Sequence, residues 1–406
     1  MELWEQLFLP ECWQEFVQYK IEKQHLSGRE QEELKKYIEE KTYLSVLKEI
    51  EGVKNTFPLP MKKEVNKSGV AKKRVVYSFP KDFNILLKMI AFLLYRYDSV
   101  FADNCYAFRR NYGVRDAVRR IRTMKGIGHK YCLKVDVSNY FNSIDVSMLL
   151  EKLSFLKKED EKLYAFLKRV LTADRAVTVE NGQECVIIEK RGAMAGIPIS
   201  PFLANVYLSE VDRFFQEEDV TYFRYSDDIL LFADSPEELE KYRGLLYEKI
   251  EAHGLTLNLS KVHISHPGEA FEFLGFRFDD GRVELSDSTM LKIKAKIKRK
   301  AHALRRWQMK KNLSGERAAK GFIKSMNRKF YDSGDGTEFS WSRWFFPCLT
   351  SDERLKEIDV YMQQYIRFCV TGRHYKGNYR ISYEQMKDWG YRSLVHEYYG
   401  MRQGSS

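Results

Sequence analysis

The sequence predicts an α+β fold, in which a part that mixes sheet and helix is followed by an α-helical part. Short β-branched runs alternate with helical periodicity from about residue 55 to residue 285. From about residue 286 the composition becomes basic, helical and rich in Trp, Tyr and Arg. The chain has 406 residues and 44% hydrophobic content, which favours two or three packed units over disorder.

The elements before residue 142 begin with helices. Residues 1–54 are predicted to form a helical extension, since apolar residues recur there at helical spacing. Residues 55–80 carry three prolines around the run "RVVYSF", which predicts a hairpin with a basic tip. The elements expected next are a buried helix over 81–101, a helix over 112–128 and a strand within 129–141.

The elements after residue 142 alternate between strands and helices. A helix is expected over 143–156, and a strand from residue 183 enters the loop "RGAMAGIPIS". Ser200 is expected to cap a helix over 200–218. Next come a hairpin over 222–235, a helix capped by Ser235, a hairpin over 271–285 turning at Asp280–Gly281, and a long basic helix over 286–311. Three tryptophans are expected in the core: Trp307, Trp341 and Trp344.

Net charge and cysteine spacing narrow the classes of protein that fit this sequence. The chain carries 68 Lys and Arg against 57 Asp and Glu, a net charge of +11, which favours a polyanionic partner and nucleic acid above others. Its six cysteines are scattered without a CxxC pair, so neither a zinc site nor a disulfide scaffold is indicated. The apolar runs are too short to span a bilayer, and the start has no basic leader. We therefore expect a cytoplasmic protein without a membrane partner.

Adjacent carboxylates interrupt the hairpin predicted over 222–235. Asp227 and Asp228 lie between the runs "YFRY" and "ILLFA", where like charges repel and do nothing for packing. Carboxylate oxygens are the ligands that Mg²⁺ prefers, in a shell shared with phosphates. A site with two such ions needs acids from more than one strand. Asp136, directly after the strand "YCLKV", supplies the further acid if the two strands are neighbours.

Seven segments, in order along the chain, resemble the motifs of reverse transcriptases. Three carry the catalytic pattern: "KVDVSNYFNSID", "GIPISPFLANVYL" and "YSDD". Four more resemble the fingers motif, the FR-containing stretch of bacterial intron-related enzymes, the lysine-bearing palm motif and the primer grip: "AKKRVVYSFP", "YAFRRNYGVRDAVRRI", "LTLNLSKVHI" and "FEFLGFRF". The resemblance covers residues 55–280 and implies a right-hand polymerase. Fingers and palm with an antiparallel sheet would span 55–285, an α-helical thumb 286–345, and a helical RNA-binding region 346–406.

The resemblance also implies a role for individual residues. Asp136 and Asp227 would bind two Mg²⁺ ions, with Mn²⁺ as an alternative, helped by the Val137 carbonyl. Asp228 would be the supporting acid, and Lys261 the general acid that protonates the pyrophosphate leaving group. The substrate-binding residues would be Lys67, Lys73 and Arg74 at the triphosphate, Gly196 in the nucleotide loop, Tyr225 and Ser226 near the primer end, and Phe141 as an aromatic gate against a ribose 2′-OH.

The activity implied is RNA-directed DNA synthesis from dNTPs by two-metal nucleotidyl transfer. The RNA template would be a dedicated noncoding RNA, and the setting bacterial defence against phage. Many family members have Pro-Gln-Gly where this chain has Met194-Ala195-Gly196. That departure leaves three alternatives open: template-independent or protein-primed DNA synthesis, a diversity-generating-retroelement enzyme, and a non-catalytic RNA-binding maturase. A homo-oligomer or a second protein partner also stays open.

Overall fold

The computed structural model describes residues 1–24, 26, 28–52, 57–66, 73–331 and 340–403. The chain forms two compact units. The first comprises Met1–Ala117 and Lys125–Glu269, and the second comprises Val118–Met124 and Ala270–Ser406. Helices and sheets are mixed, so the predicted α+β class is confirmed. Within the described part of the chain, no helix is long and apolar enough to cross a membrane.

The N-terminal helices pack together around one buried tryptophan. Their bounds are α1 Leu3–Gln6, α2 Pro10–Gln24, α3 Gly28–Glu39 and α4 Thr42–Glu51. The Trp13 ring stacks on Tyr43 with ring centroids 4.7 Å apart, and its indole N–H donates to the Leu7 carbonyl. α2 and α4 both contact α5 (Lys81–Leu93), the buried helix that the sequence predicts there. The predicted helical extension is thereby tied to the first unit.

The first sheet has the order β2-β1-β4-β5. Its strands are β1 Met61–Asn66, β2 Lys73–Ser78, β4 Arg175–Glu180 and β5 Gln183–Ile188. β1 and β2 form the predicted antiparallel hairpin, and the predicted basic tip, 67–72, lies outside the described residues. β4 was not predicted. It pairs with β5 antiparallel and with β1 parallel, so β4 is held by partners on both sides.

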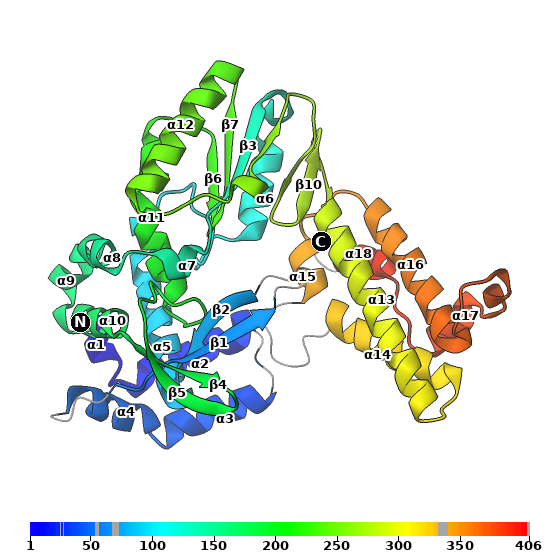
Figure 1. Ribbon diagram of the computed structural model, residues 1–406, viewed down its shortest axis with the longest axis horizontal. Coiled ribbons are helices and arrows are strands. Elements are labelled where there is room, and N and C mark those ends of the chain that lie inside the picture. Colours follow the sequence, from blue (N-terminus) through cyan, green and yellow to red (C-terminus); the bar gives the residue numbers. More distant parts are fainter. Residues whose placement is uncertain (25, 27, 53–56, 67–72, 332–339, 404–406) are drawn as a thin grey trace. The chain divides into compact units, whose positions relative to one another are not determined.

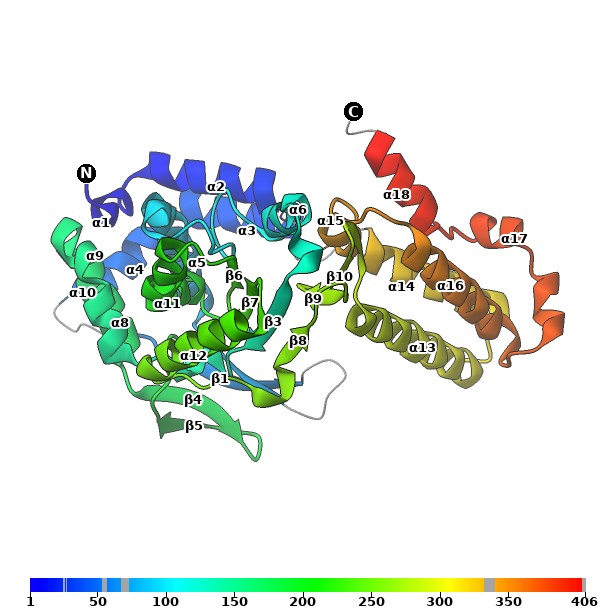
Figure 2. The same cartoon turned by 90° about the horizontal axis from the view of Figure 1, so that it is seen from above.

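The second sheet is antiparallel throughout, with the order β6-β7-β3-β8. Its strands are β3 Tyr131–Asp136, β6 Tyr222–Tyr225, β7 Asp228–Ala233 and β8 His263–Ser265. Helices α11 (Ser200–Glu217) and α12 (Pro236–Ala252) pack against it (Figures 1 and 2). The Ser235 hydroxyl accepts from the Glu238 N–H, so the predicted cap of α12 is confirmed.

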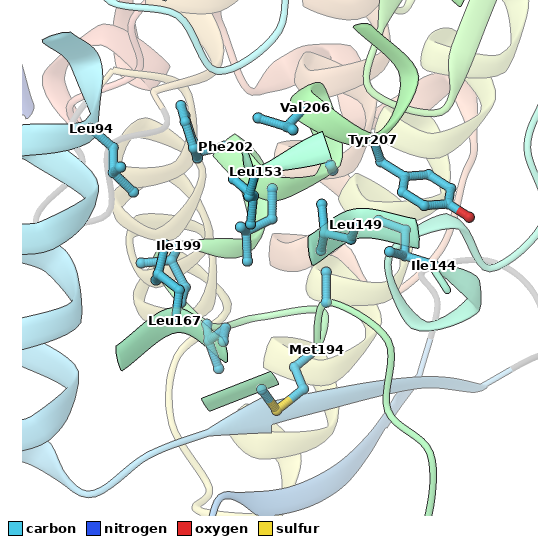
Figure 3. Packing of buried hydrophobic residues seen from close by; sticks show 14 of the residues in the cluster. Leu94, Ile144, Leu149, Leu153, Leu167, Met194, Ile199, Phe202, Val206 and Tyr207 are labelled. Carbon is cyan, nitrogen blue, oxygen red and sulfur yellow. The ribbon is translucent and has the colours of Figure 1, made fainter. Parts of the chain in front are cut away.

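The hydrophobic core of the first unit joins these layers. The other elements of the first unit are η1 Leu94–Val100, η2 Ile127–His129, α7 Tyr140–Ser143, α8 Val146–Lys152, α9 Ser154–Glu159 and α10 Glu161–Thr172, while α6 (Val114–Thr123) is divided between the two units. Met194 and Ile199 of the loop before α11 are fully buried in the same cluster as Leu149, Leu153 and Leu167 (Figure 3). The loop is therefore fixed by apolar packing.

The second unit combines a small sheet with a helical bundle. The sheet has the order β11-β10-β9, with strands β9 Phe271–Phe273, β10 Phe276–Asp279 and β11 Arg282–Leu285. Asp280 and Gly281 both have positive φ, which confirms the predicted turn. Helices α13 (Asp287–Lys310), α14 (Gly315–Phe330) and α16 (Glu353–Thr371) run side by side (Figures 1 and 2).

Shorter elements complete the second unit. They are α15 Trp341–Phe345, η4 Lys376–Arg380, α17 Tyr383–Asp388 and α18 Leu394–Gln403. The buried Asp359 carboxylate on α16 accepts from the Ser393 hydroxyl at 2.6 Å and the Leu394 N–H at 2.9 Å, which fixes the start of α18. Trp341 is buried as predicted, whereas Trp307 is 41% exposed because it lies on an outward face of α13, so its core prediction was wrong.

Candidate active site

A two-residue turn between β6 and β7 presents the adjacent acids. Tyr225 pairs with Asp228 across the hairpin, so Ser226 and Asp227 alone form the turn. Ser226 has φ of 62°, and positive φ at the first turn residue is the geometry that keeps two tightly connected strands in register. Ser226 is buried, and its carbonyl accepts from the Arg224 guanidinium at 3.3 Å. The turn is therefore rigidly held from inside the sheet.

The pairing of β3 with β7 brings the third acid to this turn. In register, Asp136 lies opposite Asp228, and the Val137 N–H donates to the Asp227 carbonyl at 2.9 Å. β3 and β7 are therefore neighbours, as the predicted site requires. The β3–β7 ladder ends at the Asp136–Asp228 pair, and Asp227 follows in the turn, so three carboxylates lie at one end of the sheet.

Lys261 forms an ion pair with one of these three acids. It ends the short helix η3 (Leu259–Lys261), just before β8, and its Nζ lies 2.7 Å from Asp136 Oδ1. The Asn258 N–H donates to the Asp136 carbonyl at 2.8 Å, so the same segment is fastened to the end of β3. The Lys261 side chain is half-exposed, whereas that of Asp136 is largely buried. A half-exposed ammonium at the mouth of a buried acid cluster is free to change partner.

Burial makes the Asp227 and Asp228 carboxyls ionise less readily than exposed ones. It raises the pKa of Asp227, with the Asp136 charge acting in the same direction and the charges of Arg74 and Lys261 opposing it. Burial also raises the pKa of Asp228 to about 6, opposed by Lys134 and reinforced by Asp227 and Asp136. A bound cation would therefore stabilise the charged forms of both carboxylates, which burial disfavours.

The donor set fits Mg²⁺ in the way that nucleotide enzymes hold it. Mg²⁺ takes oxygen ligands and is commonly held by one or two carboxylates plus substrate phosphates and water. Asp136 and Asp227 supply such carboxylates from adjacent strand ends. Within the described ranges, no group of three or more His, Cys, Asp or Glu side chains is placed to hold a metal ion. Two carboxylates at neighbouring positions fit an ion that takes its other ligands from substrate and water.

The loop that contains Gly192 and Gly196 packs closely against β2 and against the segment after β3. A Cβ on Gly192 would lie 2.6 Å from the Phe141 carbonyl oxygen, and one on Gly196 would lie 2.8 Å from the Tyr77 carbonyl oxygen. Both glycines have positive φ, so only glycine satisfies both the backbone angle and the close approach. Asn142, which the sequence did not single out, accepts from the Ala195 N–H at 2.8 Å and donates to the Val75 carbonyl at 3.2 Å.

The predicted cap at Ser200 was wrong. The position before α11 is Ile199, which has helical backbone angles and no side-chain cap. Ser200 lies in the first turn and its hydroxyl contacts two loop carbonyls, those of Ala193 and Met194. The hydroxyl is drawn to these carbonyls because they are buried and need a donor. Ser200 therefore fixes the loop and begins α11 without capping it.

The residues expected at the triphosphate lie on β2 or beyond the described ranges. Lys73 and Arg74 are both exposed, and Lys73 Nζ pairs with Glu64 Oε2 at 2.7 Å. The charge of Arg74 acts on Asp227, which places its guanidinium in the field of the acid cluster. Lys67 lies outside the described residues. Phe141 is half-buried in α7, and Tyr225 is largely buried, which raises its pKa to about 12.

Two further groups support the turn without having been predicted. Arg224, in the middle of β6, is fully buried and paired with the fully buried Asp212 of α11. Phe108 lies with its ring 6.2 Å, centroid to centroid, from both Phe141 and Tyr225. The only sequence signal for Arg224 was an arginine inside an apolar strand, since the charged partner of such a residue must come from another element.

The first unit combines a second sheet with an antiparallel sheet that gathers acids at one hairpin turn, which is the arrangement expected of a right-hand polymerase. A family model described as reverse transcriptase (RNA-dependent DNA polymerase) matches residues 62–278. Because this match spans more than half of the 406 residues, the chain belongs to the reverse transcriptase family. The resemblance found in the sequence is thereby confirmed.

Individual relatives match only in part. The retron Ec86 reverse transcriptase of Escherichia coli is 33% identical over 106 residues, which is 25% of this chain and 33% of the relative. The retron Mx65 reverse transcriptase of Myxococcus xanthus is 26% identical over 155 residues, 37% of this chain and 36% of the relative. The matched part thus spans about a third of these relatives. A solved telomerase of Candida tropicalis, in complex with a fragment of telomeric RNA, has a TM-score of 0.47 at 11% identity and covers 86% of this chain and 67% of its own.

The buried charge of Asp228 yields a prediction about stability. Its pKa of about 6 lies above the ordinary value of about 3.9, so the folded state binds the proton more tightly than the unfolded state. The stability that this proton provides is complete below about pH 4 and is lost as the pH rises to about 6. We therefore expect Asp228→Asn to raise the free energy of unfolding of the metal-free protein by about 1–3 kcal/mol at pH 7.5, and by much less at pH 4.

Urea unfolding in EDTA at the two pH values measures this effect. Asp234→Asn is the matched control, since Asp234 is exposed near the other end of β7 and pairs only at the surface with Lys130. The control is expected to change stability by less than about 1 kcal/mol at both pH values. An equal gain at pH 4 and pH 7.5 for Asp228→Asn would mean that the buried charge is not its source.

Proposed function

We propose that the protein is an RNA-directed DNA polymerase that extends a primer with dNTPs along an RNA template. The observation that carries the proposal is the β3–β7 register, which brings Asp136, Asp227 and Asp228 to one hairpin turn in a chain of the reverse transcriptase family. Two bound Mg²⁺ ions, or Mn²⁺ in their place, would activate the primer 3′-OH and neutralise charge on the triphosphate. Asp136, Asp227 and the Val137 carbonyl would hold them, with Asp228 as the supporting acid.

The basic residues around the three acids would bind the triphosphate and protonate the leaving group. Arg74, exposed on β2 and acting on Asp227, would bind its phosphates, with Lys73 and Lys67 assisting. Lys261 holds a proton 2.7 Å from Asp136 Oδ1 and would donate it to the departing pyrophosphate as a general acid. Since this ammonium is half-exposed, it can leave Asp136 when phosphate arrives.

The remaining residues would shape the primer and sugar positions. The Tyr225–Ser226 end of the turn would lie near the primer end, and the close approach at Gly196 would leave room for the nucleotide. The ring of Phe141 would exclude a ribose 2′-OH and so select dNTPs. Primer extension on an RNA template with each dNTP in turn tests the proposal, and templated addition that requires a divalent metal is the expected result.

Untemplated or protein-primed synthesis is the second candidate function. At the aligned loop position Met194 is fully buried with φ of 55°, and Ala195 is buried too. Neither side chain carries an amide that could hydrogen bond near a template base, unlike the glutamine of many family members. Homopolymeric product from one dNTP without added template would favour this candidate.

We further propose that residues 346–406 bind the RNA partner through a basic aromatic segment, defined as residues 372–380. The segment contains Arg373, Lys376 and Arg380 and no acid. Tyr375 and Tyr379 are 46% and 69% exposed, so both rings are accessible to a ligand. Exposed aromatic rings beside arginines bind single-stranded RNA by stacking on bases and pairing with phosphates.

The segment is held in shape from inside. The Asn378 side chain is buried and donates to the Arg373 carbonyl at 2.7 Å. The guanidinium of Arg367 lies 5.0 Å from the centre of the Tyr379 ring, which limits the motion of that ring. A pre-shaped stacking surface loses less entropy on binding than a loose one.

Removal of both rings tests this surface. We expect Tyr375→Ala/Tyr379→Ala to weaken binding of a single-stranded RNA of about 20 nucleotides by about 30-fold or more, since each stacked base contributes about 1–3 kcal/mol. Fluorescence anisotropy at fixed salt measures the affinity. Tyr399→Ala is the control, because Tyr399 is exposed to a similar extent but lies on α18. An equal loss in the control would place the binding elsewhere.

The proposed setting is the bacterial cytoplasm, with a dedicated noncoding RNA as template in defence against phage. The similarity to proteins named as retron reverse transcriptases supports a specialised bacterial enzyme. Phage plating on cells that express the protein or its Asp227→Asn variant tests the role. Loss of protection in the variant is the expected result, and equal protection would favour the RNA-binding maturase.

A further inference from the structure

Phe108 has a backbone conformation that a bulky aromatic residue rarely adopts. Its φ is 58°, in the left-handed region that glycine and asparagine tolerate. The residue belongs to no helix or strand, and its side chain is 37% exposed, so core packing does not explain the strain. Strain of this kind persists where the surroundings impose it, and it is concentrated at functional sites.

The neighbours on both sides of Phe108 impose its conformation. On one side, the buried Arg109 guanidinium donates to the Asp98 carboxylate and to the carbonyls of Ala102 and Cys105. On the other side, the Ala107 carbonyl accepts from the Asn205 amide at 2.7 Å. The backbone of Phe108 is thus held between two anchored residues.

The ring of Phe108 meets two aromatic residues of the candidate active site. Its centroid lies 6.2 Å from that of Phe141, edge to face at an interplanar angle of 62°. It also lies 6.2 Å from that of Tyr225, tilted by 48°. Tyr225 is the last residue before the turn that carries Asp227. Phe108 therefore connects the residue proposed as sugar gate with the hairpin that presents the acids.

We propose that Phe108 is a positioning residue for sugar selection, which acts by fixing the orientation of the Phe141 ring. This inference rests on the proposed function. A gate excludes a 2′-OH only if it cannot swing aside, and a half-buried ring needs a lateral contact to be held in place. The edge-to-face contact with Phe108 supplies that contact. Without it, Phe141 gains room to rotate when a ribonucleotide enters, so discrimination falls while dNTP addition continues.

The test uses substitutions that the backbone tolerates. Phe108→Gly removes the ring and also suits a φ of 58°, so it adds no strain. Phe108→Asn is a second ring-free variant for the same backbone region, and Phe108→Tyr keeps the ring. The quantity measured is kcat/KM for one dNTP and for its rNTP, on the same primer and RNA template with Mg²⁺. Phe141→Ala, alone and combined with Phe108→Gly, shows whether Phe108 acts through Phe141.

The expected result is a drop of about tenfold in the dNTP-to-rNTP ratio of kcat/KM for both ring-free variants, with kcat for the dNTP changed by less than about fivefold. Phe108→Tyr is expected to keep the wild-type ratio. Adding Phe108→Gly to Phe141→Ala is expected to change nothing further, since the gate is already gone.

Two results overturn the inference while leaving the proposed function standing. In one, the wild type selects dNTPs and both ring-free variants select them equally well. In the other, the effects of Phe108→Gly and Phe141→Ala on the ratio multiply, so that Phe108 acts independently of Phe141. A wild type that incorporates neither nucleotide contradicts the proposed function itself, and the inference falls with it.

Discussion

Asp227→Asn is expected to reduce nucleotide incorporation by about a thousandfold or more without unfolding the protein. The amide keeps the shape of the carboxylate but carries no charge for a divalent cation, and a loss of this size corresponds to about 4 kcal/mol of transition-state stabilisation. The fold should not suffer, because burial and the neighbouring Asp136 already oppose the charge of Asp227. Single-nucleotide extension of an RNA-templated primer measures the rate.

The same result is expected for Asp136→Asn, with one difference. Asp136 is paired with Lys261, so its substitution also frees an ammonium at the mouth of the site. Asp234→Asn serves again as control, since it removes an acid from the same sheet but from near the opposite end of β7. Activity within a few-fold of wild type for Asp227→Asn, in a well-folded preparation, would show that the turn does not hold the catalytic ions.

Arg224→Met is expected to lower the free energy of unfolding by about 3–5 kcal/mol. The Arg224 and Asp212 side chains are both fully buried, and Arg224 Nε donates to Asp212 Oδ1 at 2.7 Å while Nη2 pairs with Oδ2. Burial lowers the pKa of Arg224, but the charge and hydrogen bond of Asp212, together with Cys105 and Tyr140, outweigh this effect and raise the pKa well above the ordinary value. Removing the cation leaves a buried carboxylate without a counter-charge.

Urea unfolding of three variants separates this effect from a general loss of packing. Arg277→Met is the control, because Arg277 forms a surface pair with Asp279 and should change stability by less than about 1 kcal/mol. The double variant Arg224→Met/Asp212→Leu removes both charges and should recover much of the loss. The account of the pair is wrong if Arg224→Met is no less stable than the control.

Arg224 also connects stability to the site. Its guanidinium donates to the Ser226 carbonyl at 3.3 Å and to the Asn205 Oδ1 at 3.4 Å. The turn that carries Asp227 is therefore supported by the same buried pair that stabilises the sheet. This explains why a charged residue lies inside an apolar strand, where it would otherwise destabilise the fold.

The strands and acids of the site could be predicted because they depend on local patterns. Alternation in β3, the two apolar runs around Asp227 and the cap at Ser235 are readable over a few residues. The register between β3 and β7 is not, since it depends on pairing across about ninety residues of chain. The sequence thus predicted that Asp136 and Asp227 meet if their strands are neighbours, but not that Asp136 lies opposite Asp228.

The parts that escaped prediction depend on contacts between distant segments. Ser200 looked like a cap, but buried carbonyls of the preceding loop attract its hydroxyl. Phe108 lies in the FR-containing stretch, but the sequence assigned it no role, because its strain is imposed by the anchoring of Arg109 and Ala107. Asn142 and the pair Arg224–Asp212 likewise acquire their roles only when several elements meet. Local propensity cannot specify such tertiary constraints.

Sequencing of the nucleic acid that copurifies with the protein, beside an Asp227→Ala/Asp228→Ala variant, tests the central claim most directly. If the protein copies RNA into DNA, we expect a discrete RNA together with complementary DNA in the wild type, and the RNA alone in the variant. RNA without DNA in both preparations, or DNA that persists in the variant, would contradict it.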